Sequence, residues 1–130
     1  MAPEYSGWIL VVEDDRTTLM LLSTRLINAG YRVLPAVNGL EAWMIAEREK
    51  PGLVISDMLL TKMDAMSLCR KIKEHPELAA TKVILATAVF KQAAFRAEAR
   101  MSGVDEFVEK PFDMDIILSR VRALVGDPVA

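Results

Sequence analysis

The sequence predicts an α/β protein, a doubly wound sandwich in which helices cover both faces of a parallel five-stranded sheet. Short apolar runs rich in β-branched residues alternate with longer amphipathic segments, and this alternation is typical of right-handed β–α–β crossovers. Turn-forming or charged residues bound each run, as expected for strands. The expected strands are residues 8–12, 33–37, 53–56, 83–86 and a short segment around 107–108.

Helical spacing marks the segments between the strands. Leu19, Leu22 and Leu26 repeat at positions i, i+3 and i+7, and Gly30 follows as the expected cap of that helix. The fourth helix is expected to turn one face, which excludes Phe95, toward the sheet. The residues that mark helices two to five are Leu40, Trp43 and Met44; Leu68 and Ile72; Phe90, Ala94, Ala97 and Met101; and Ile117, Val121 and Leu124.

Composition also suggests the order of the strands. The first, third and fourth runs are almost wholly apolar, as in strands covered on both faces. The second run contains Pro35, which cannot donate a ladder hydrogen bond and therefore favours an edge. Charged residues around the fifth run, among them Glu106 and Glu109, are also typical of an edge. These positions fit (βα)5 with the flavodoxin-like strand order 2-1-3-4-5.

Length and charge exclude several classes of protein. Residues 1–130 are expected to form a single domain with its core at about 8–125. Sixteen Lys and Arg against eighteen Asp and Glu give a net charge of −2, which argues against direct nucleic-acid binding. No apolar run is longer than that of residues 8–12, which is far shorter than the roughly 20 residues that cross a membrane. With one cysteine and no signal peptide, a cytoplasmic protein that does not bind membranes is expected.

Polar side chains follow four of the five predicted strands, at the point where each strand ends. Glu13 and Asp14 follow the first strand, and Asp57 follows the third. Thr87 follows the fourth strand, and Lys110 follows the fifth. Because the carboxyl ends of parallel strands meet at one edge, these groups should converge at the switch point between strands one and three.

The three acids favour a divalent cation. Carboxylates this close cannot all stay ionised without compensating charge, and Mg²⁺ suits carboxylate oxygens, carbonyls and water. Asp15 is expected to cap the following helix, which leaves Glu13 and Asp14 for the metal. Asp57 taken alone could be a turn former, but opposite an acid pair it is better explained as a ligand and nucleophile.

Thr87 and Lys110 complete the charge pattern. Either residue alone is unremarkable at a strand end, but a hydroxyl can donate to an oxyanion. The bond between Lys110 and Pro111 can be cis, which would aim the lysine inward. A cation, a hydroxyl, a metal and a carboxylate around one point indicate a phosphoryl-transfer site.

These motifs resemble the receiver domain of two-component response regulators. The matching stretches are residues 9–15, 53–57, 83–88 and 103–112, and their order and spacing are specific. The resemblance implies that Asp57 accepts a phosphoryl group from the phosphohistidine of a sensor histidine kinase or a histidine phosphotransfer protein. Such a protein is a signalling switch rather than an enzyme, although it assists its own phosphotransfer and dephosphorylation.

The resemblance also implies roles for the surrounding residues. Asp14, Asp57 and the backbone carbonyl of Leu59 would bind Mg²⁺, with Glu13 acting through a bound water. Thr87 and Lys110 would contact the phosphoryl oxygens. Phe107 would be the aromatic switch, moving inward as Thr87 shifts. The surface of the fourth strand, fourth helix and fifth strand would then control a partner or an output domain.

Two further expectations concern surfaces and loops. A homodimer would form through the fourth helix, fifth strand and fifth helix, where Phe95 is the exposed aromatic residue. Thr61 and Ala65 stand where receivers usually have Pro and Gly, so the loop after Asp57 lacks the rigidity of Pro and the positive φ open to Gly.

Competing interpretations fit the residues less well. A module that signals without phosphate would be expected to lack the acids or the lysine, and both are present. A haloacid dehalogenase-type phosphatase needs Asp-x-Asp after the first strand, but Glu13 stands where its nucleophile should be. A flavodoxin cradles phosphate with Gly, Ser and Thr, whereas this first loop is acidic, and the sequence contains no P-loop motif.

Overall fold

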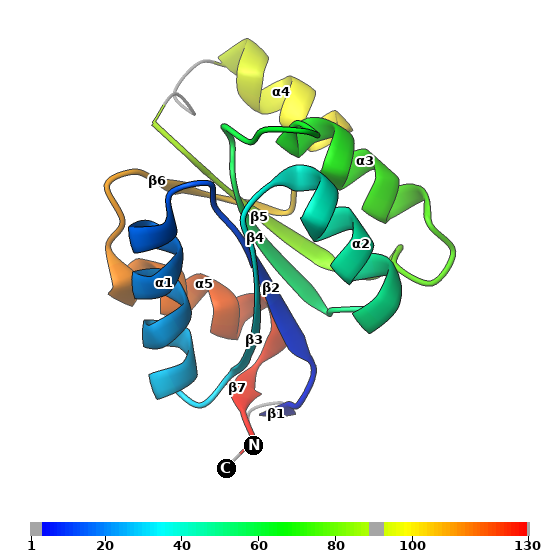
Figure 1. Cartoon of the computed structure of the whole chain (residues 1–130). Helices are drawn as coiled ribbons and strands as arrows, with labels where there is room; N and C mark the ends of the chain where they lie inside the picture. Colours follow the sequence, from blue (N-terminus) through cyan, green and yellow to red (C-terminus); the bar gives the residue numbers. More distant parts are fainter. Residues whose placement is uncertain (1–3, 89–92, 130) are drawn as a thin grey trace.

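A computed structural model describes residues 4–88 and 93–129, with the side chains of 93–95 excepted. Its central sheet is parallel and has the strand order β3-β2-β4-β5-β6 (Figure 1). In chain order this is 2-1-3-4-5, so the predicted fold and strand order are confirmed. The strands are β2 (Trp8–Val12), β3 (Arg32–Ala36), β4 (Leu53–Asp57), β5 (Lys82–Thr87) and β6 (Glu106–Glu109).

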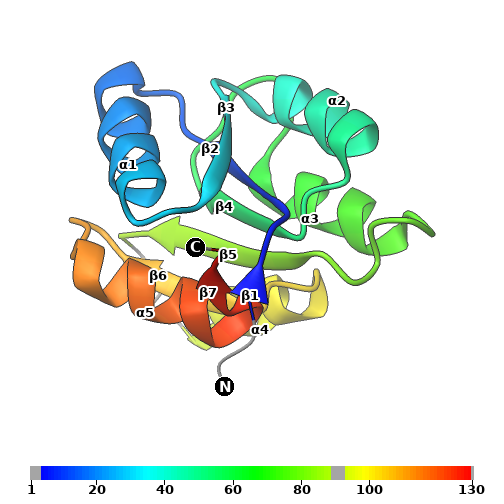
Figure 2. The same cartoon turned by 90° about the horizontal axis from the view of Figure 1, so that it is seen from below.

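Helices cover both faces of this sheet. Helices α1 and α5 lie on one face, and α2, α3 and α4 lie on the other (Figures 1 and 2). Successive strand residues alternate between the faces, so Ile9 and Val11 pack under α1 and α5 while Leu10 and Val12 pack under α2 and α3. The helices are α1 (Arg16–Asn28), α2 (Gly39–Glu49), α3 (Ala65–Glu74), α4 (Ala93–Met101) and α5 (Met114–Val125).

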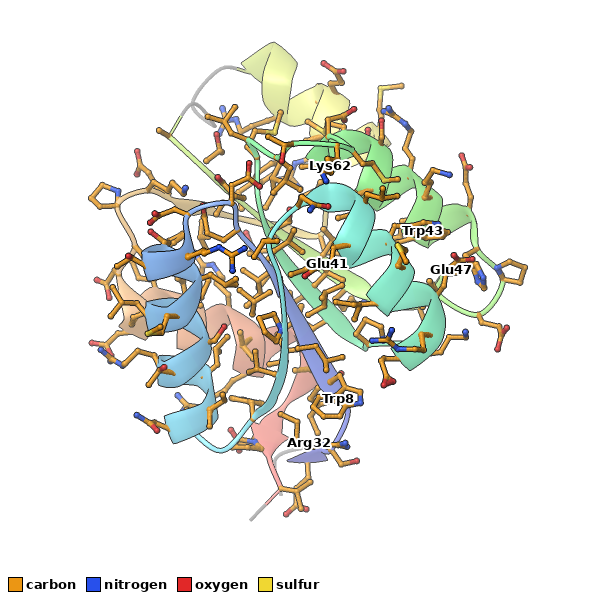
Figure 3. All side chains as sticks on the ribbon, viewed as in Figure 1. Trp8, Arg32, Glu41, Trp43, Glu47 and Lys62 are labelled. Carbon is orange, nitrogen blue, oxygen red and sulfur yellow. The ribbon has the colours of Figure 1, made fainter. Side chains whose placement is uncertain are left out.

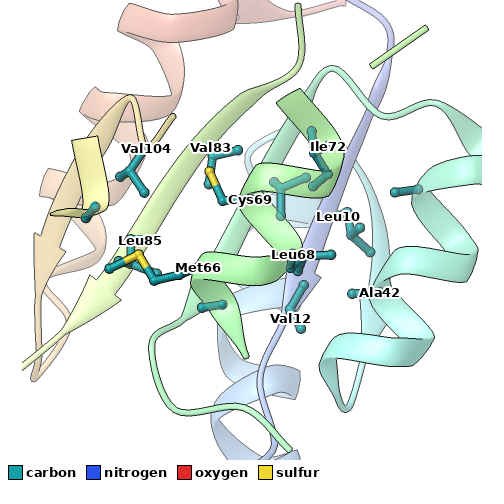
Figure 4. Close-up of a cluster of buried hydrophobic side chains, with 14 of the residues drawn as sticks. Leu10, Val12, Ala42, Met66, Leu68, Cys69, Ile72, Val83, Leu85 and Val104 are labelled. Atoms are coloured by element: carbon teal, nitrogen blue, oxygen red, sulfur yellow. The ribbon is translucent and has the colours of Figure 1, made fainter. Parts of the chain in front are cut away.

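The predicted inner faces of three helices are confirmed. Leu19, Leu22 and Leu26 of α1 are buried, as are Leu68 and Ile72 of α3. Figure 4 shows the α3 residues packed between the sheet and the neighbouring helices. In α5, the buried residues are Ile117 and Val121, with Leu124 half-buried.

The marker residues of α2 and α4 correspond poorly to the buried faces. In α2 the buried residues are Gly39, Ala42 and Ala46, whereas Met44 is 59% exposed. In the described part of α4, Ala99 is buried, and Met101 is 89% exposed. Both helices approach the sheet through small residues. In α2 the markers Leu40 and Met44 are exposed, whereas Trp43 is partly buried and packs against the core. The predicted positions Phe90, Ala94 and Phe95 lie outside the described residues or side chains.

A second, small sheet joins the two ends of the described chain. Strand β1 (Glu4–Tyr5) pairs in parallel with β7 (Asp127–Pro128), an element that the sequence did not predict. The Tyr5 hydroxyl donates to the Trp8 carbonyl at 2.6 Å and accepts from the Gly52 N–H at 2.8 Å. This sheet lies at the amino ends of the main strands (Figure 1). None of the described helices is long and apolar enough to span a bilayer.

Candidate functional site

Three of the predicted site residues meet at the carboxyl ends of the strands. Asp57 is the last residue of β4, Glu13 directly follows β2, and Lys110 directly follows β6. The Lys110 Nζ lies 3.0 Å from Asp57 Oδ1 and 3.3 Å from Glu13 Oε2. The peptide bond between Lys110 and Pro111 is cis. The convergence expected from the strand ends is therefore present for these side chains.

Burial makes the electrostatics of this cluster strong. Glu13 is 4% exposed and Asp57 is 8% exposed. Burial raises the pKa of Glu13, and the negative charge of Asp57 raises it further. The hydrogen bond from the Asp15 N–H and the positive charge of Lys110 act in the opposite direction, but they do not outweigh burial. Burial alone would lower the pKa of Lys110, but hydrogen bonds and charges of Asp57 and Glu13 outweigh it and raise the pKa. Lys110 is therefore a protonated ammonium group that the two carboxylates hold in place.

Asp15 caps α1, as the sequence suggested, whereas Asp14 makes no such bond through its buried oxygen. The Asp15 carboxylate accepts the Thr18 N–H at 3.0 Å and caps α1. The Asp14 Oδ1 atom is buried and has no hydrogen-bond partner. A buried acceptor without a donor costs free energy, and a cation ligated there would remove that cost. The donor set next to Asp57 therefore fits a hard divalent cation such as Mg²⁺.

Within the described residues, no three His, Cys, Asp or Glu side chains stand in a geometry that could already hold a metal ion. The Lys110 ammonium lies within 3.3 Å of both Glu13 and Asp57 and occupies the space between them. The ligand roles of Glu13, Asp14, Asp57 and the Leu59 carbonyl thus stay predictions.

The remaining predicted residues surround this cluster. Thr87 ends β5 and is buried. Phe107 on β6 is 8% exposed and packs into the core beneath α3 and α4, so its ring already lies inward. The side chain of Leu59 is 78% exposed, two residues past Asp57. Movement of Thr87 and Phe107 as a switch stays a prediction.

The loop after Asp57 carries contacts that sequence reasoning missed. The Met58 N–H donates to the Ala86 carbonyl at 2.9 Å, and the Thr61 carbonyl accepts from the Gly39 N–H at 3.1 Å. Thr61 is exposed, and Ala65 is buried in the first turn of α3. The only sequence signal for the contact between Gly39 and Thr61 was the pair Asn38-Gly39 at the beginning of α2. This pair does not indicate which loop packs against it.

The family model for the response regulator receiver domain matches residues 9–122. The chain belongs to this family. The receiver is 34% identical over 117 residues to the "DNA-binding dual master transcriptional regulator RpaA" of Synechocystis, covering 90% of this chain and 48% of that protein. It is also 34% identical over 119 residues to "Response regulator PleD" of Caulobacter vibrioides, covering 92% of this chain and 26% of that protein. The chain thus spans about half or less of the length of these relatives.

Solved structures agree with the family. The signal receiver domain of a signal transduction histidine kinase from Syntrophus aciditrophicus matches with a TM-score of 0.84 and 34% identity, covering 92% of this chain and 90% of that one. The receiver domain of the sensor histidine kinase PA1611 from Pseudomonas aeruginosa matches with a TM-score of 0.84 and 25% identity, covering 95% and 100%. That neighbour was solved with a magnesium ion coordinated in its active-site cleft.

Proposed function

We propose that this receiver is a signalling switch in which Asp57 accepts a phosphoryl group from the phosphohistidine of a sensor histidine kinase or a histidine phosphotransfer protein. The observation that carries the proposal is the position of Lys110, with its Nζ 3.0 Å from Asp57 Oδ1 and 3.3 Å from Glu13 Oε2. A held cation next to a buried carboxylate at the strand ends is the arrangement that phosphoryl transfer needs.

The proposed chemistry uses groups of the chain in distinct roles. An oxygen of Asp57 attacks phosphorus, a P–O bond forms, and the P–N bond to the donor imidazole breaks with its electron pair returning to the ring nitrogen. Lys110 stabilises the charge on the phosphoryl oxygens, and the Thr87 hydroxyl donates to one of them. Asp14, Asp57 and the Leu59 carbonyl would hold Mg²⁺, with Glu13 acting through water. When bound, the metal supplies positive charge between the carboxylates and the incoming phosphate.

A surface beside the site supports docking of the phosphoryl donor. A pocket of about 460 Å³ lies between α1 and the segment after β6, and its lining includes Leu21, Lys110 and Phe112. Leu21 and Met20 are largely exposed on α1. An apolar surface adjoining the lysine suits a helical partner that presents its histidine to Asp57.

The proposed output surface is formed by β5, α4 and β6, through Thr87 and Phe107. A groove between α4, β6 and α5, lined by residues that include Arg100, Phe107 and Ile116, supports docking of a partner or a second copy there. The side chain of Phe95, assigned to this surface from the sequence, lies outside the described part of the chain. A single receiver domain over 1–130, in the cytoplasm and without direct membrane or nucleic-acid contact, belongs to the same proposal.

Mass spectrometry after exposure to acetyl phosphate and Mg²⁺ tests the assignment. Wild-type protein should gain one phosphoryl group, and Asp57→Asn should gain none. Asp64→Asn is the matched control, because Asp64 is a nearby exposed carboxylate that caps α3 and Asn preserves that cap. Labelling of Asp57→Asn, or labelling of wild type in excess chelator, would overturn the proposal.

A further inference from the structure

The first turn of α2 is bonded to the loop that follows Asp57. The Gly39 N–H donates to the Thr61 carbonyl at 3.1 Å, and the Met63 N–H donates to the same carbonyl at 2.8 Å. Asn38 caps the helix beside this contact by accepting the Glu41 N–H at 2.8 Å. Lys62, labelled in Figure 3, lines a pocket together with Asn38 and Glu41 at the amino end of α2. The loop therefore rests on the beginning of α2 as well as on its own strand and helix.

Only glycine fits at position 39, because the backbone of Met63 occupies the place that a Cβ atom would take. A Cβ atom built on Gly39 would lie 1.9 Å from the Met63 carbonyl oxygen and 2.8 Å from its carbon. The φ of Gly39 lies outside the left-handed region, so its dihedral angle alone would admit other residues. Both colliding atoms belong to the backbone, so no side-chain rotation can relieve the collision. Any other residue at position 39 must push the loop away from α2.

Apart from the partly buried side chains of Met58, Leu60 and Met63, which pack against the core, the described loop has few other restraints along its length. Thr61 and Ala65 stand where receivers usually have Pro and Gly, and Lys62 adopts a φ of 69°, which is costly for a residue with a side chain. Thr61 and Lys62 are both exposed. The Met58 N–H bond to Ala86 holds the start of the loop, and the contact with Gly39 holds its middle.

We propose that Gly39 is a positioning residue for the phosphorylation site. By admitting the Met63 carbonyl against α2, it fixes residues 58–64, and with them the Leu59 carbonyl four residues earlier. This inference rests on the proposed function, which assigns that carbonyl to Mg²⁺. A residue with a side chain at position 39 would displace the loop and weaken metal binding without touching the metal ligands themselves.

The test compares two glycine variants at opposite ends of β4. Gly39→Ala disturbs the loop that follows the strand. Gly52→Ala is the matched control, because Gly52 directly precedes the strand and a Cβ there would lie 2.4 Å from the Tyr5 hydroxyl oxygen. Mg²⁺ affinity is measured by calorimetry, and amide hydrogen exchange is followed at residues 58–64, with both variants kept well below their unfolding midpoints.

Gly39→Ala should bind Mg²⁺ about 10-fold more weakly than wild type, as expected when a group that orients a ligand is displaced. Its residues 58–64 should exchange faster, while the rest of the main sheet should not. Gly52→Ala should match wild type in both measurements. Should Gly39→Ala fold poorly, Asn38→Ala provides a second variant, because loss of the cap frays the same helical turn and should also speed exchange at 58–64.

Three outcomes would count against the inference or its basis. Unchanged exchange at residues 58–64 in Gly39→Ala overturns it, whether or not the protein binds Mg²⁺. Equal loss of Mg²⁺ affinity in both glycine variants also overturns it, because the effect would then be general destabilisation. If wild type shows no Mg²⁺ binding that depends on Asp57, the metal assignment fails, and the exchange measurement alone decides whether Gly39 positions the loop.

Discussion

Lys110 contacts two buried carboxylates, so its loss separates the binding of metal from the response to phosphate. In Lys110→Ala, Mg²⁺ should still bind, because acids and a carbonyl are the proposed ligands. The structural response to beryllofluoride, which mimics the phosphoryl group, should be lost, because its fluorine atoms, which take the places of the phosphoryl oxygens, lack their lysine contact. Calorimetry measures the first, and amide chemical-shift changes in α4 and β6 measure the second. Lys82→Ala, at the opposite end of the sheet, serves as the control, and collapse of Mg²⁺ affinity in Lys110→Ala would refute the assignment.

Cys69 is expected to be unreactive in the folded receiver. The residue is 1% exposed on α3, and burial raises the pKa of its thiol to about 11. A shift of this size leaves roughly 100-fold less thiolate at neutral pH than an unperturbed thiol would have. An aromatic disulfide reagent should therefore react slowly with native protein and rapidly in denaturant. Fast native reaction would show that α3 opens readily.

The raised pKa of Cys69 also determines the direction in which the stability of the fold changes with pH. A group whose pKa is higher in the folded state stabilises the fold below its unfolded pKa and loses that contribution as pH rises through the folded value. Wild type should thus lose more stability than Cys69→Ala between about pH 9 and pH 11. Denaturant titrations of both proteins across this range measure the difference, and parallel curves would contradict it.

Leu59 should slow the hydrolysis of the phosphorylated receiver. Its exposed apolar side chain lies two residues past Asp57 and cannot orient an attacking water by a hydrogen bond. Because positioning by a polar group contributes on the order of 10²-fold to such steps, Leu59→Asn should lose phosphate several-fold faster than wild type. Val89, two residues past Thr87, is apolar as well, and it lies outside the described residues.

A time course after removal of the phosphodonor, at fixed Mg²⁺, measures this rate. Leu40→Asn, an exposed leucine on α2, should decay as wild type does. Equal decay in Leu59→Asn would leave Asp57 as the proposed phosphoacceptor but remove the role given to Leu59.

At the scale of elements, Tyr5 ties the small β1–β7 sheet to the main one. Its hydroxyl donates to the Trp8 carbonyl and accepts from the Gly52 N–H, so Tyr5→Phe removes both of these bonds. The Gly52 N–H keeps one acceptor, because it also donates to the Trp8 carbonyl at 3.2 Å. Loss of a hydrogen bond whose partners are not left orphaned costs about 0.5–1.5 kcal/mol, and denaturant unfolding should show a decrease of this size. Mg²⁺ affinity should not change, since Tyr5 lies at the amino ends of the strands. Unaltered stability would mean that solvent replaces the hydroxyl.

The elements that the sequence predicted well are those with strong periodicity. The run of Trp8 to Val12 is strand β2 in the structure, and Leu19, Leu22 and Leu26 form the inner face of α1. Helix α2 buries Ala42 and Ala46 instead of its larger residues, and small residues give little hydrophobic contrast in a sequence. Strands β1 and β7 have two residues each, too few to show any alternation.

Part of the candidate site could also be predicted, because parallel strands deliver their carboxyl ends to one edge. This rule brought Glu13, Asp57 and Lys110 together correctly. It could not show that Lys110 stands between two acids, or that Asp14 has a buried oxygen without a donor. Nor could it reveal the approach of Met63 to Gly39, because that contact joins two loops whose paths depend on the whole packed fold.

At the scale of the whole molecule, both tryptophans lie away from the proposed phosphorylation site. The guanidinium carbon of Arg32 lies 3.9 Å from the ring centre of Trp8 at the start of β2 (Figure 3), and Trp43 on α2 lies 6.0 Å from the ring of His75. Mg²⁺ or beryllofluoride should therefore leave tryptophan fluorescence essentially unchanged, while a titration followed by NMR detects binding. Strong quenching on addition of Mg²⁺ would show that binding reaches α2 or the amino ends of the strands.

The pairing of β1 with β7 places the point where the chain comes into the domain one strand spacing, about 5 Å, from the point where it leaves. A unit with such adjacent ends can be spliced into a surface loop of a host protein without stretching that loop. Because β1 and β7 run parallel, the host chain would leave in the direction in which it arrived. Because the proposed phosphorylation site lies at the carboxyl ends of the strands, opposite β1 and β7, a host protein would respond to phosphorylation only through contact with that opposite end of the receiver.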